Sequence, residues 1–275
     1  MNTFPLIFYV AATAFYALHF ARRTPALGHV ATMFLMAGAM AHTFVIGMQT
    51  MEVGHVPFVG RAQAISTFVW LLGLSYLYTE MSSEERAMGV VILPMMVLLQ
   101  LVPVLSPIRE PRIAALESPW FWVHVSSLLF SYASFALAGV IGVTYILQFK
   151  EIKKKQLGYL YQRLPSLQVM DVMNGRAVAV GWCFLTLGVA VGAFWAVTVR
   201  SIAPQDPRVQ AMGALDPKIF VAIVTWLIYS FSVVARRTLG WHGRRAAWLS
   251  AAGFIVVMLN FLPISYFVTT SHTFE

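Results

Sequence analysis

The stretch WFWVHVSSLLFSYASFALAGVIGVTYILQ, which occupies residues 120–148, decides the fold class. It contains no Asp, Glu, Lys or Arg, and a basic run from Lys150 to Lys155 follows it almost at once. An α-helix needs about 20 apolar residues to cross the hydrocarbon of a bilayer, whereas a barrel strand needs only about 10 alternating ones. Because the stretch is longer than a spanning helix requires and does not alternate, it predicts a membrane-spanning helix.

The composition of the whole chain agrees with that prediction. Of its 275 residues, 59% are hydrophobic and 11% are charged, and the mean hydropathy is +0.73. Soluble domains carry about 25% charged residues, so these values exclude a soluble globular protein, a disordered chain and a disulfide-rich secreted domain. The net charge of +8 comes from basic residues in short loops between apolar segments. This pattern is typical of membrane topology, so we expect the lipid bilayer as a partner and no nucleic acid. The single cysteine, Cys183, lies in an apolar run and excludes thiol-relay chemistry within this chain.

Eight segments of the chain are apolar and long enough to span a membrane as helices. None of them alternates with a period of two residues, so a helical bundle is the structure that satisfies their backbone groups in lipid. The sequence therefore predicts an all-α fold, a polytopic membrane helical bundle that forms a single integral membrane domain over residues 1–275. The predicted transmembrane helices lie near residues 3–20, 27–48, 62–79, 88–106, 120–148, 177–199, 218–235 and 247–269.

The loops between these segments differ in their content of basic residues. Alternate loops on one side contain 13 of them: Arg22, Arg23, Arg86, Lys150, Lys153, Lys154, Lys155, Arg163, Arg176, Arg236, Arg237, Arg244 and Arg245. The other side contains 6: Arg61, Arg109, Arg112, Arg200, Arg208 and Lys218. Because Lys and Arg are retained in the cytoplasm, the first set is predicted to be cytoplasmic, with both termini on the outer side of the inner (plasma) membrane. The longest cytoplasmic loop is then expected at residues 149–176.

Two of the seven histidines share one predicted depth in the membrane. His124 begins the fifth segment on the outer side, and His272 follows the outer end of the eighth. Two neutral imidazoles at one depth can supply opposite axial ligands to a haem iron or two ligands to another metal ion. The alternative is that they are unrelated interfacial histidines. His42 lies within the second segment and His55 in the first outer loop, while the cytoplasmic ends hold His19, His29 and His242.

The neighbours of His124 are consistent with a haem site. Trp120 and Trp122 place aromatic rings beside it, although aromatic residues are common at any membrane interface. Arg61 and Arg109 on the same side can pair with haem propionates, as guanidinium groups do with carboxylates. The sequence contains no phosphate-binding loop, HExxH motif or nucleophile elbow, and no paired carboxylates lie within a segment. Hydrolase and ATPase functions are therefore excluded.

Several ordered stretches resemble one known family. The segment WVHVSSLLFSYASF begins at Trp122, Asp216-Pro217-Lys218 follows the sixth predicted helix, and GWHGRRAAWL begins at Gly240. In this order they are similar to the haem-handling cytochrome c assembly family, which includes the CcsA (ResC), CcmC and HemX proteins. The similarity extends over roughly residues 30–275, and residues 120–275 correspond to the family core.

The resemblance implies a membrane protein that holds or delivers b-type haem at the outer face for attachment to apocytochrome c. It implies that His124 and His272 are the axial ligands of the haem iron and that Asp216 belongs to the loop that covers the haem. It also implies a separate accessory membrane protein of the ResB type. No residue is expected to be catalytic in itself, so any enzyme function would be that of a subunit of a cytochrome c synthetase (haem lyase).

The chain departs from the family pattern at two places. The family loop reads approximately WGxxWxWDPKE, but Val209, Gly213 and Leu215 replace its tryptophans here. Val234 occupies a position where CcsA proteins carry a histidine in the seventh helix. These departures favour an alternative function, that of a HemX-like, non-enzymatic membrane scaffold or regulator of haem synthesis. A quinone-binding subunit of a respiratory complex is a third possibility, supported only by the general apolar character.

The distribution of basic residues generates a topology prediction. Reporter fusions after Arg23, Glu85, Lys155 and Arg237 are expected to report a cytoplasmic location, because the basic loops stay inside. Fusions after Glu52, Pro111, Gln205 and His272 are expected to report the outside. Alkaline phosphatase and fluorescent-protein fusions measure the two states. A cytoplasmic C-terminus would contradict the prediction and separate His272 from His124.

Overall fold

The computed structural model describes the chain outside residues 54–55, 57–59, 107–117, 156–157, 203–216 and 260–275. The described residues form helices and connecting turns, with no β-strand among them. The helices are α1 (Thr3–Arg22), α2 (Pro25–Val53), α3 (Arg61–Ser83), α4 (Gly89–Leu105), α5 (Pro119–Lys153), α6 (Tyr159–Arg163), α7 (Leu167–Ile202), α9 (Pro217–Thr238) and α10 (Arg244–Leu259).

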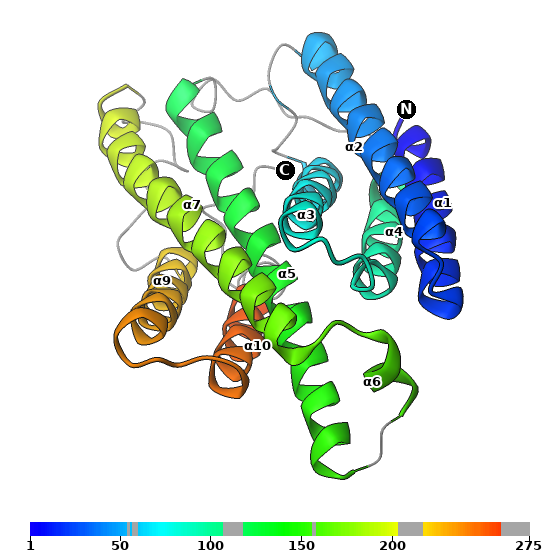
Figure 1. Ribbon diagram of the computed structural model, residues 1–275. Coiled ribbons are helices and arrows are strands. Elements are labelled where there is room, and N and C mark those ends of the chain that lie inside the picture. Colours follow the sequence, from blue (N-terminus) through cyan, green and yellow to red (C-terminus); the bar gives the residue numbers. More distant parts are fainter. Residues whose placement is uncertain (54–55, 57–59, 107–117, 156–157, 203–216, 260–275) are drawn as a thin grey trace.

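Helices α5 and α7 form the centre of the bundle. They pack along each other, with α1 to α4 on one side of the pair and α9 and α10 on the other (Figure 1). Within its most apolar stretch, 83% of the residues of α5 are buried, which identifies it as the core helix. The ring of Phe135 on α5 stacks on Tyr229 of α9 with centroids 3.5 Å apart, so α5 contacts helices of both flanking groups. This helix also begins five residues before His124 and therefore positions it.

A helix lies at each of the eight apolar segments predicted from the sequence. Five of them, α1, α2, α5, α7 and α9, are long and apolar enough to cross a membrane, and α4 is apolar but shorter. Helix α3 is less apolar because it carries buried polar side chains, among them Gln63, Ser66, Ser75 and Glu80. The structure supports a helical membrane bundle, while the number of eight spans and the side of the termini stay predictions.

The prediction of a long loop over residues 149–176 is wrong in its extent, because both flanking helices continue into that range. Helix α5 continues to Lys153, and α7 begins at Leu167, ten residues before the predicted sixth segment. Hydropathy fails at this point because Asp171 and Arg176 are charged, but both have partners in the protein. Asp171 pairs with Arg236 of α9, and Arg176 Nη1 donates a hydrogen bond to the Ser82 carbonyl at 2.6 Å. The charged turns therefore remain helical.

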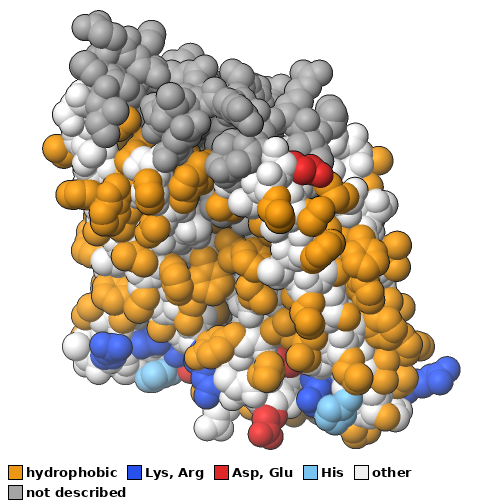
Figure 2. Space-filling view, turned by 90° about the horizontal axis from the view of Figure 1, so that it is seen from above, with side chains coloured by type: hydrophobic (Ala, Val, Ile, Leu, Met, Phe, Trp, Pro, Cys, Tyr) orange, Lys and Arg blue, Asp and Glu red, His pale blue; other side chains and the backbone are white. Residues whose placement is uncertain are grey.

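The surface of the bundle has the pattern of a membrane protein. Apolar side chains cover the middle of the face seen in Figure 2, and Lys, Arg and His side chains lie along one rim. Basic residues occur in the last turns of α1, α5, α6 and α9 and in the first turn of α10. Because successive helices run in opposite directions, these ends lie on the same side of the bundle. This is the side that the distribution of basic residues predicts to be cytoplasmic.

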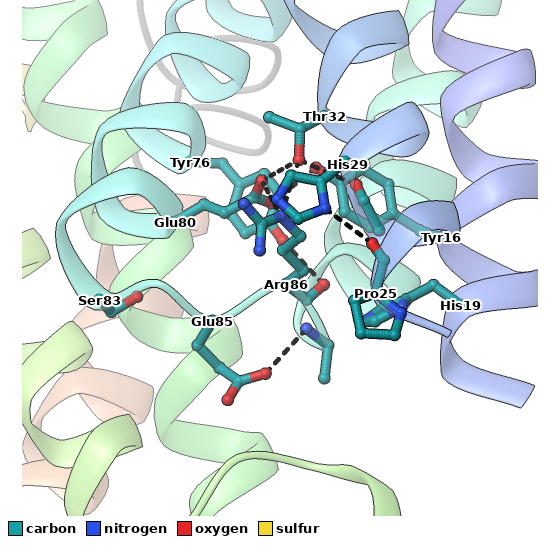
Figure 3. A network of polar contacts seen from close by, with 12 residues as sticks. Tyr16, His19, Pro25, His29, Thr32, Tyr76, Glu80, Ser83, Glu85 and Arg86 are labelled. Carbon is teal, nitrogen blue, oxygen red and sulfur yellow. Dashed lines mark hydrogen bonds and ion pairs between the residues drawn. The ribbon is translucent and has the colours of Figure 1, made fainter. Parts of the chain in front are cut away.

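A buried carboxylate joins helices α1, α2 and α3 near the basic rim of the bundle (Figure 3). Glu80 of α3 is 1% exposed and accepts hydrogen bonds from Tyr16 of α1 at 2.6 Å and from Thr32 of α2. Arg86 lies 3.8 Å from the same carboxylate and also donates to Thr32 at 3.2 Å. Tyr76 donates to the backbone carbonyl of Arg86 at 3.3 Å. One charge therefore ties three helices and the turn before α4 together.

His42 of α2 is also a core residue of the α1–α4 part of the bundle. Its side chain is fully buried, with Nδ1 3.1 Å from the Tyr9 hydroxyl and Nε2 2.8 Å from the Ser66 hydroxyl. Both ring nitrogens thus have partners on α1 and α3. A histidine with both nitrogens engaged has no lone pair ready for a metal ion. This arrangement supports a packing role for His42.

The Glu80 cluster generates a stability prediction. Replacing Glu80→Gln keeps the shape of the side chain but removes the charge that Tyr16, Thr32 and Arg86 share. Hydrogen bonds to charged groups contribute about 2 kcal/mol each, so the free energy of unfolding is expected to fall by at least this amount. Thermal unfolding of the detergent-solubilised protein measures the change. Glu84→Gln, at an exposed position of the same helix end, is the matched control, and equal melting temperatures for the two variants would contradict the prediction.

Candidate functional site around His124

The structure describes some of the predicted site residues and not others. His124, Trp120 and Trp122 lie in the first two turns of α5. Arg61 is the first residue of α3, and the structure describes its backbone but not its side chain. His272, Arg109 and Asp216 lie outside the described residues, as do the substituted loop positions Val209, Gly213 and Leu215. The geometry of the site is therefore built from His124.

A hydrogen bond to helix α7 fixes the protonation and direction of the His124 ring. Its Nδ1 lies 2.7 Å from the backbone carbonyl oxygen of Gly188. A carbonyl oxygen can only accept, so Nδ1 carries the proton and donates. The lone pair is then on Nε2, for which no hydrogen-bond partner occurs among the described residues. This pairing of one ring nitrogen with a carbonyl is typical of histidines that bind a metal through the other nitrogen.

Two glycines on α7 form the groove that holds the ring. A Cβ atom on Gly192 would lie 2.4 Å from both Cε1 and Nδ1 of His124, which is closer than any side chain can approach. A Cβ atom on Gly188 would lie 2.8 Å from Leu128, one turn further along α5. His124 and Leu128 therefore pack into a groove between Gly188 and Gly192. A side chain at position 192 would push the imidazole away from the Gly188 carbonyl.

Trp195, on the same helix as the two glycines, is an aromatic neighbour of the imidazole. Its ring lies nearly parallel to that of His124, with centroids 6.4 Å apart and an interplanar angle of 20°. Phe121 packs against the same indole at 5.1 Å. Trp195 is 5% exposed, yet its Nε1 has no hydrogen-bond acceptor in the described part of the chain. An unpaired buried N–H costs about 1–3 kcal/mol, so this donor is available to an acceptor from outside the described residues.

The tryptophans expected next to the ligand have other ring neighbours. Trp120 is 47% exposed and packs edge-on against Phe194, with centroids 5.0 Å apart. Trp122 packs against Phe121 at 5.0 Å. Sequence reasoning missed Gly188, Gly192 and Trp195 as neighbours of His124. The four-residue spacing of the two glycines on one helix was the available signal, because it is typical of close helix packing.

The donor set restricts the kind of metal group that can bind. No group of three or more His, Cys, Asp or Glu that could hold a metal ion occurs within the described residues. Structural zinc needs four protein ligands and catalytic zinc three. Haem iron already has four porphyrin nitrogens and needs only one or two ligands from the protein. A single prepared imidazole is thus sufficient as the contribution of the described residues to a haem site.

A second polar cluster lies at the opposite end of α7. Asp171 accepts two hydrogen bonds from the Arg236 guanidinium, at 2.8 and 3.3 Å, and one from the backbone N–H of Gly243 at 2.8 Å. Asn174 accepts from Arg236 at 3.2 Å and donates to the Ala138 carbonyl at 2.8 Å. Every charge in this cluster has a partner of opposite sign. It joins α5, α7, α9 and the turn before α10, which supports a structural role.

Comparison with known proteins places this geometry in context. A family model described as cytochrome c assembly protein matches residues 2–272. The chain is 25% identical over 252 residues to the cytochrome c biogenesis protein CcsA of Guillardia theta, covering 84% of this chain and 81% of the relative. It is 28% identical over 267 residues to CcsA of Heterosigma akashiwo, with 84% and 80% covered. It is 22% identical over 303 residues to CcsA of Trieres chinensis, with 98% and 94% covered. The chain belongs to the cytochrome c assembly protein family.

Proposed function

We propose that the protein holds b-type haem at the outer face of the membrane and delivers it for attachment to apocytochrome c. Family membership supports a membrane protein of cytochrome c biogenesis. The observation that carries the proposal is the fixed tautomer of His124, whose Nδ1 donates to Gly188 and whose Nε2 keeps its lone pair. His272 is proposed as the second axial ligand.

The residues around His124 fit haem in three respects. The glycines of α7 leave room for the imidazole, since a Cβ atom at Gly192 would overlap it. Trp195 and Phe121 add an apolar, aromatic wall, which excludes water from the iron. The unpaired Nε1–H of Trp195 is suited to a carboxylate oxygen, and haem has two propionates. We propose that Trp195 donates to one of them, with Arg61, Arg109 and Asp216 nearby in the outer loops.

The work of this chain is then to bind and orient. Bound haem supplies the iron and two vinyl groups that react with cysteine thiols of the acceptor protein. His124 would hold the haem iron through Nε2, because its own ring is fixed against α7 by the hydrogen bond to Gly188 and the contact with Trp195. Trp120 and Trp122 are proposed to extend the apolar surface toward the acceptor. Apocytochrome c and a ResB-type accessory membrane protein are the proposed partners, and the proposed location is the inner (plasma) membrane.

One observation favours a second function, that of a HemX-like scaffold or regulator. Val234 stands where a histidine is expected in the seventh predicted transmembrane segment, which corresponds to α9. Its side chain is 54% exposed on the surface of that helix. The side chain at this position faces away from the interior of the bundle, so it contributes no ligand there. Together with the loss of the loop tryptophans, this favours a protein that interacts with other subunits without transporting haem. The haem content of the purified protein separates the two functions.

The proposed ligand pair generates the first functional prediction. Replacing His124→Ala or His272→Ala is expected to lower haem retention and shift the absorption spectrum, because each removes one axial ligand. Added imidazole is expected to restore part of the spectrum in each variant. His19→Ala and His242→Ala, at the opposite rim, are the controls and should retain haem. Unchanged haem content and spectra in both outer variants, at equal protein levels, would contradict the proposal.

Trp195 generates a second prediction with a matched control. Trp195→Phe keeps an aromatic ring beside His124 but removes the N–H, so haem is expected to dissociate roughly tenfold faster or more. Trp182, on the same helix as Trp195, donates its N–H to Ser230 of α9 at 2.8 Å. Trp182→Phe removes that N–H away from the proposed site and should keep the wild-type rate. Transfer of haem to a scavenger protein measures the rate.

Haem dimethyl ester, whose propionates are uncharged, identifies the acceptor. Esterification is expected to speed dissociation from both proteins, because Arg61 and Arg109 are also proposed to pair with propionates, but by a smaller factor in Trp195→Phe. An equal effect of esterification on both proteins would show that Trp195 does not contact a propionate. A wild-type protein that binds no haem would instead reject the proposed function itself.

A further inference from the structure

A hollow at the corner between α9 and α10 is not used by the proposed haem site. It has a volume of about 840 Å³ and lies on the basic rim of the bundle, at the opposite end of α7 from Trp195. Its walls come from the turn Gly240–Gly243 and the first three turns of α10, as far as Ala252. Gly240 and Gly243 both have φ near +61°, a conformation that lets the chain reverse within four residues. The hollow is thus a product of a tight, pre-formed corner.

One end of the hollow is cationic. Arg244 and Arg245 line it and are both exposed. Each guanidinium is held by an aromatic ring: Arg244 lies 5.5 Å from the Phe149 centroid, and Arg245 lies 5.4 Å from that of Trp241. No ion pair joins either arginine to a carboxylate in the described part of the chain. Their charge is therefore positioned but not neutralised.

Asp171, the carboxylate that contacts this corner, already has partners. Asp171 pairs with Arg236, accepts from the backbone N–H of Gly243 and lies 3.4 Å from His242 Nδ1. Within the described residues, Asp171 therefore forms no ion pair with Arg244 or Arg245. Positioned guanidinium groups without a carboxylate are typical of sites that receive phosphate oxygens.

The other end of the hollow is apolar. Trp248, Leu249 and Ala252 line it one to two turns further along α10, and Trp248 is 50% exposed. Along the helix axis the lining thus changes from two cations to an indole and aliphatic side chains. A free inorganic anion would contact only the first part. An amphiphile with a phosphate at one end and hydrocarbon at the other would contact both.

We propose that this hollow binds one anionic phospholipid of the adjacent leaflet. Its phosphate lies between Arg244 and Arg245, and the start of its acyl chains lies against Trp248 and Leu249. The cytoplasmic leaflet is rich in anionic lipids, and the positive-inside distribution assigns this rim to that leaflet. The lipid would hold the α9–α10 corner at a fixed depth. The inference is independent of the haem site at the other end of the bundle.

The test uses the full-length protein reconstituted in vesicles of equal amounts of phosphatidylcholine and phosphatidylglycerol. After extraction in mild detergent, native mass spectrometry measures which lipid stays bound. The wild-type protein is expected to retain phosphatidylglycerol selectively. Arg244→Gln with Arg245→Gln is expected to lower this selectivity roughly tenfold, since each cation near a membrane surface contributes a several-fold factor. Arg244→Lys with Arg245→Lys should keep most of it, which guards against loss through misfolding.

Arg22→Gln with Arg23→Gln removes the same charge from an exposed position on the same rim and is the matched control. It should leave the selectivity unchanged. Equal loss in the two double variants would overturn the proposal and indicate only a general effect of net charge. Equal retention in wild type and Arg244→Gln with Arg245→Gln would also overturn it. Displacement of the lipid by millimolar inorganic phosphate would show that the site takes a free anion, and it would overturn the lipid assignment.

Discussion

A lipid bilayer offers no water to buried polar groups, so each polar side chain of this bundle has to find its partner within the protein. The described helices satisfy this constraint at His42 and at the carboxylates of Glu80 and Asp171, whereas some buried atoms, such as Gln63 Nε2 and the Tyr229 hydroxyl, have no partner among the described residues. Glu80 receives hydrogen bonds from two neighbouring helices, His42 is held between Tyr9 and Ser66, and Asp171 receives Arg236 and a backbone N–H. These contacts determine which helices are neighbours, because the apolar surfaces between them are interchangeable in lipid.

Two polar groups at one end of the α5–α7 pair do not meet this constraint within the described residues. His124 satisfies one ring nitrogen and leaves the other with a lone pair, and Trp195 buries an N–H without an acceptor beside it. Both groups lie at the end of the α5–α7 pair, and both are kept in place by the close approach of the two helices at Gly188 and Gly192. A ligand that brings a metal ion and a carboxylate would satisfy both groups at once. This complementarity is why haem is favoured on physical grounds as well as by family membership.

Hydropathy predicted the helical class and the position of each long helix, because those properties depend on the local composition of the chain. It failed where polar residues continue a helix, as at Asp171 in α7, since their partners come from distant parts of the sequence. His124 was identified from its position at the end of an apolar segment. The spacing of Gly188 and Gly192 indicates close helix packing, but Gly192 and Trp195 were not assigned to His124 because nothing local identifies a partner about 70 positions away. The roles of His272, Arg109 and Asp216, which lie outside the described residues, stay predictions.

The proposed function requires that one haem be held between two imidazoles at the end of the α5–α7 pair. It is tested most directly by the combined absorption and electron paramagnetic resonance spectrum of the wild-type protein, purified gently in detergent. We expect about one haem per chain, a low-spin ferric signal with two imidazole ligands, and split absorption bands on reduction. A folded protein that contains no haem and takes up none when haem is added would contradict the proposed function.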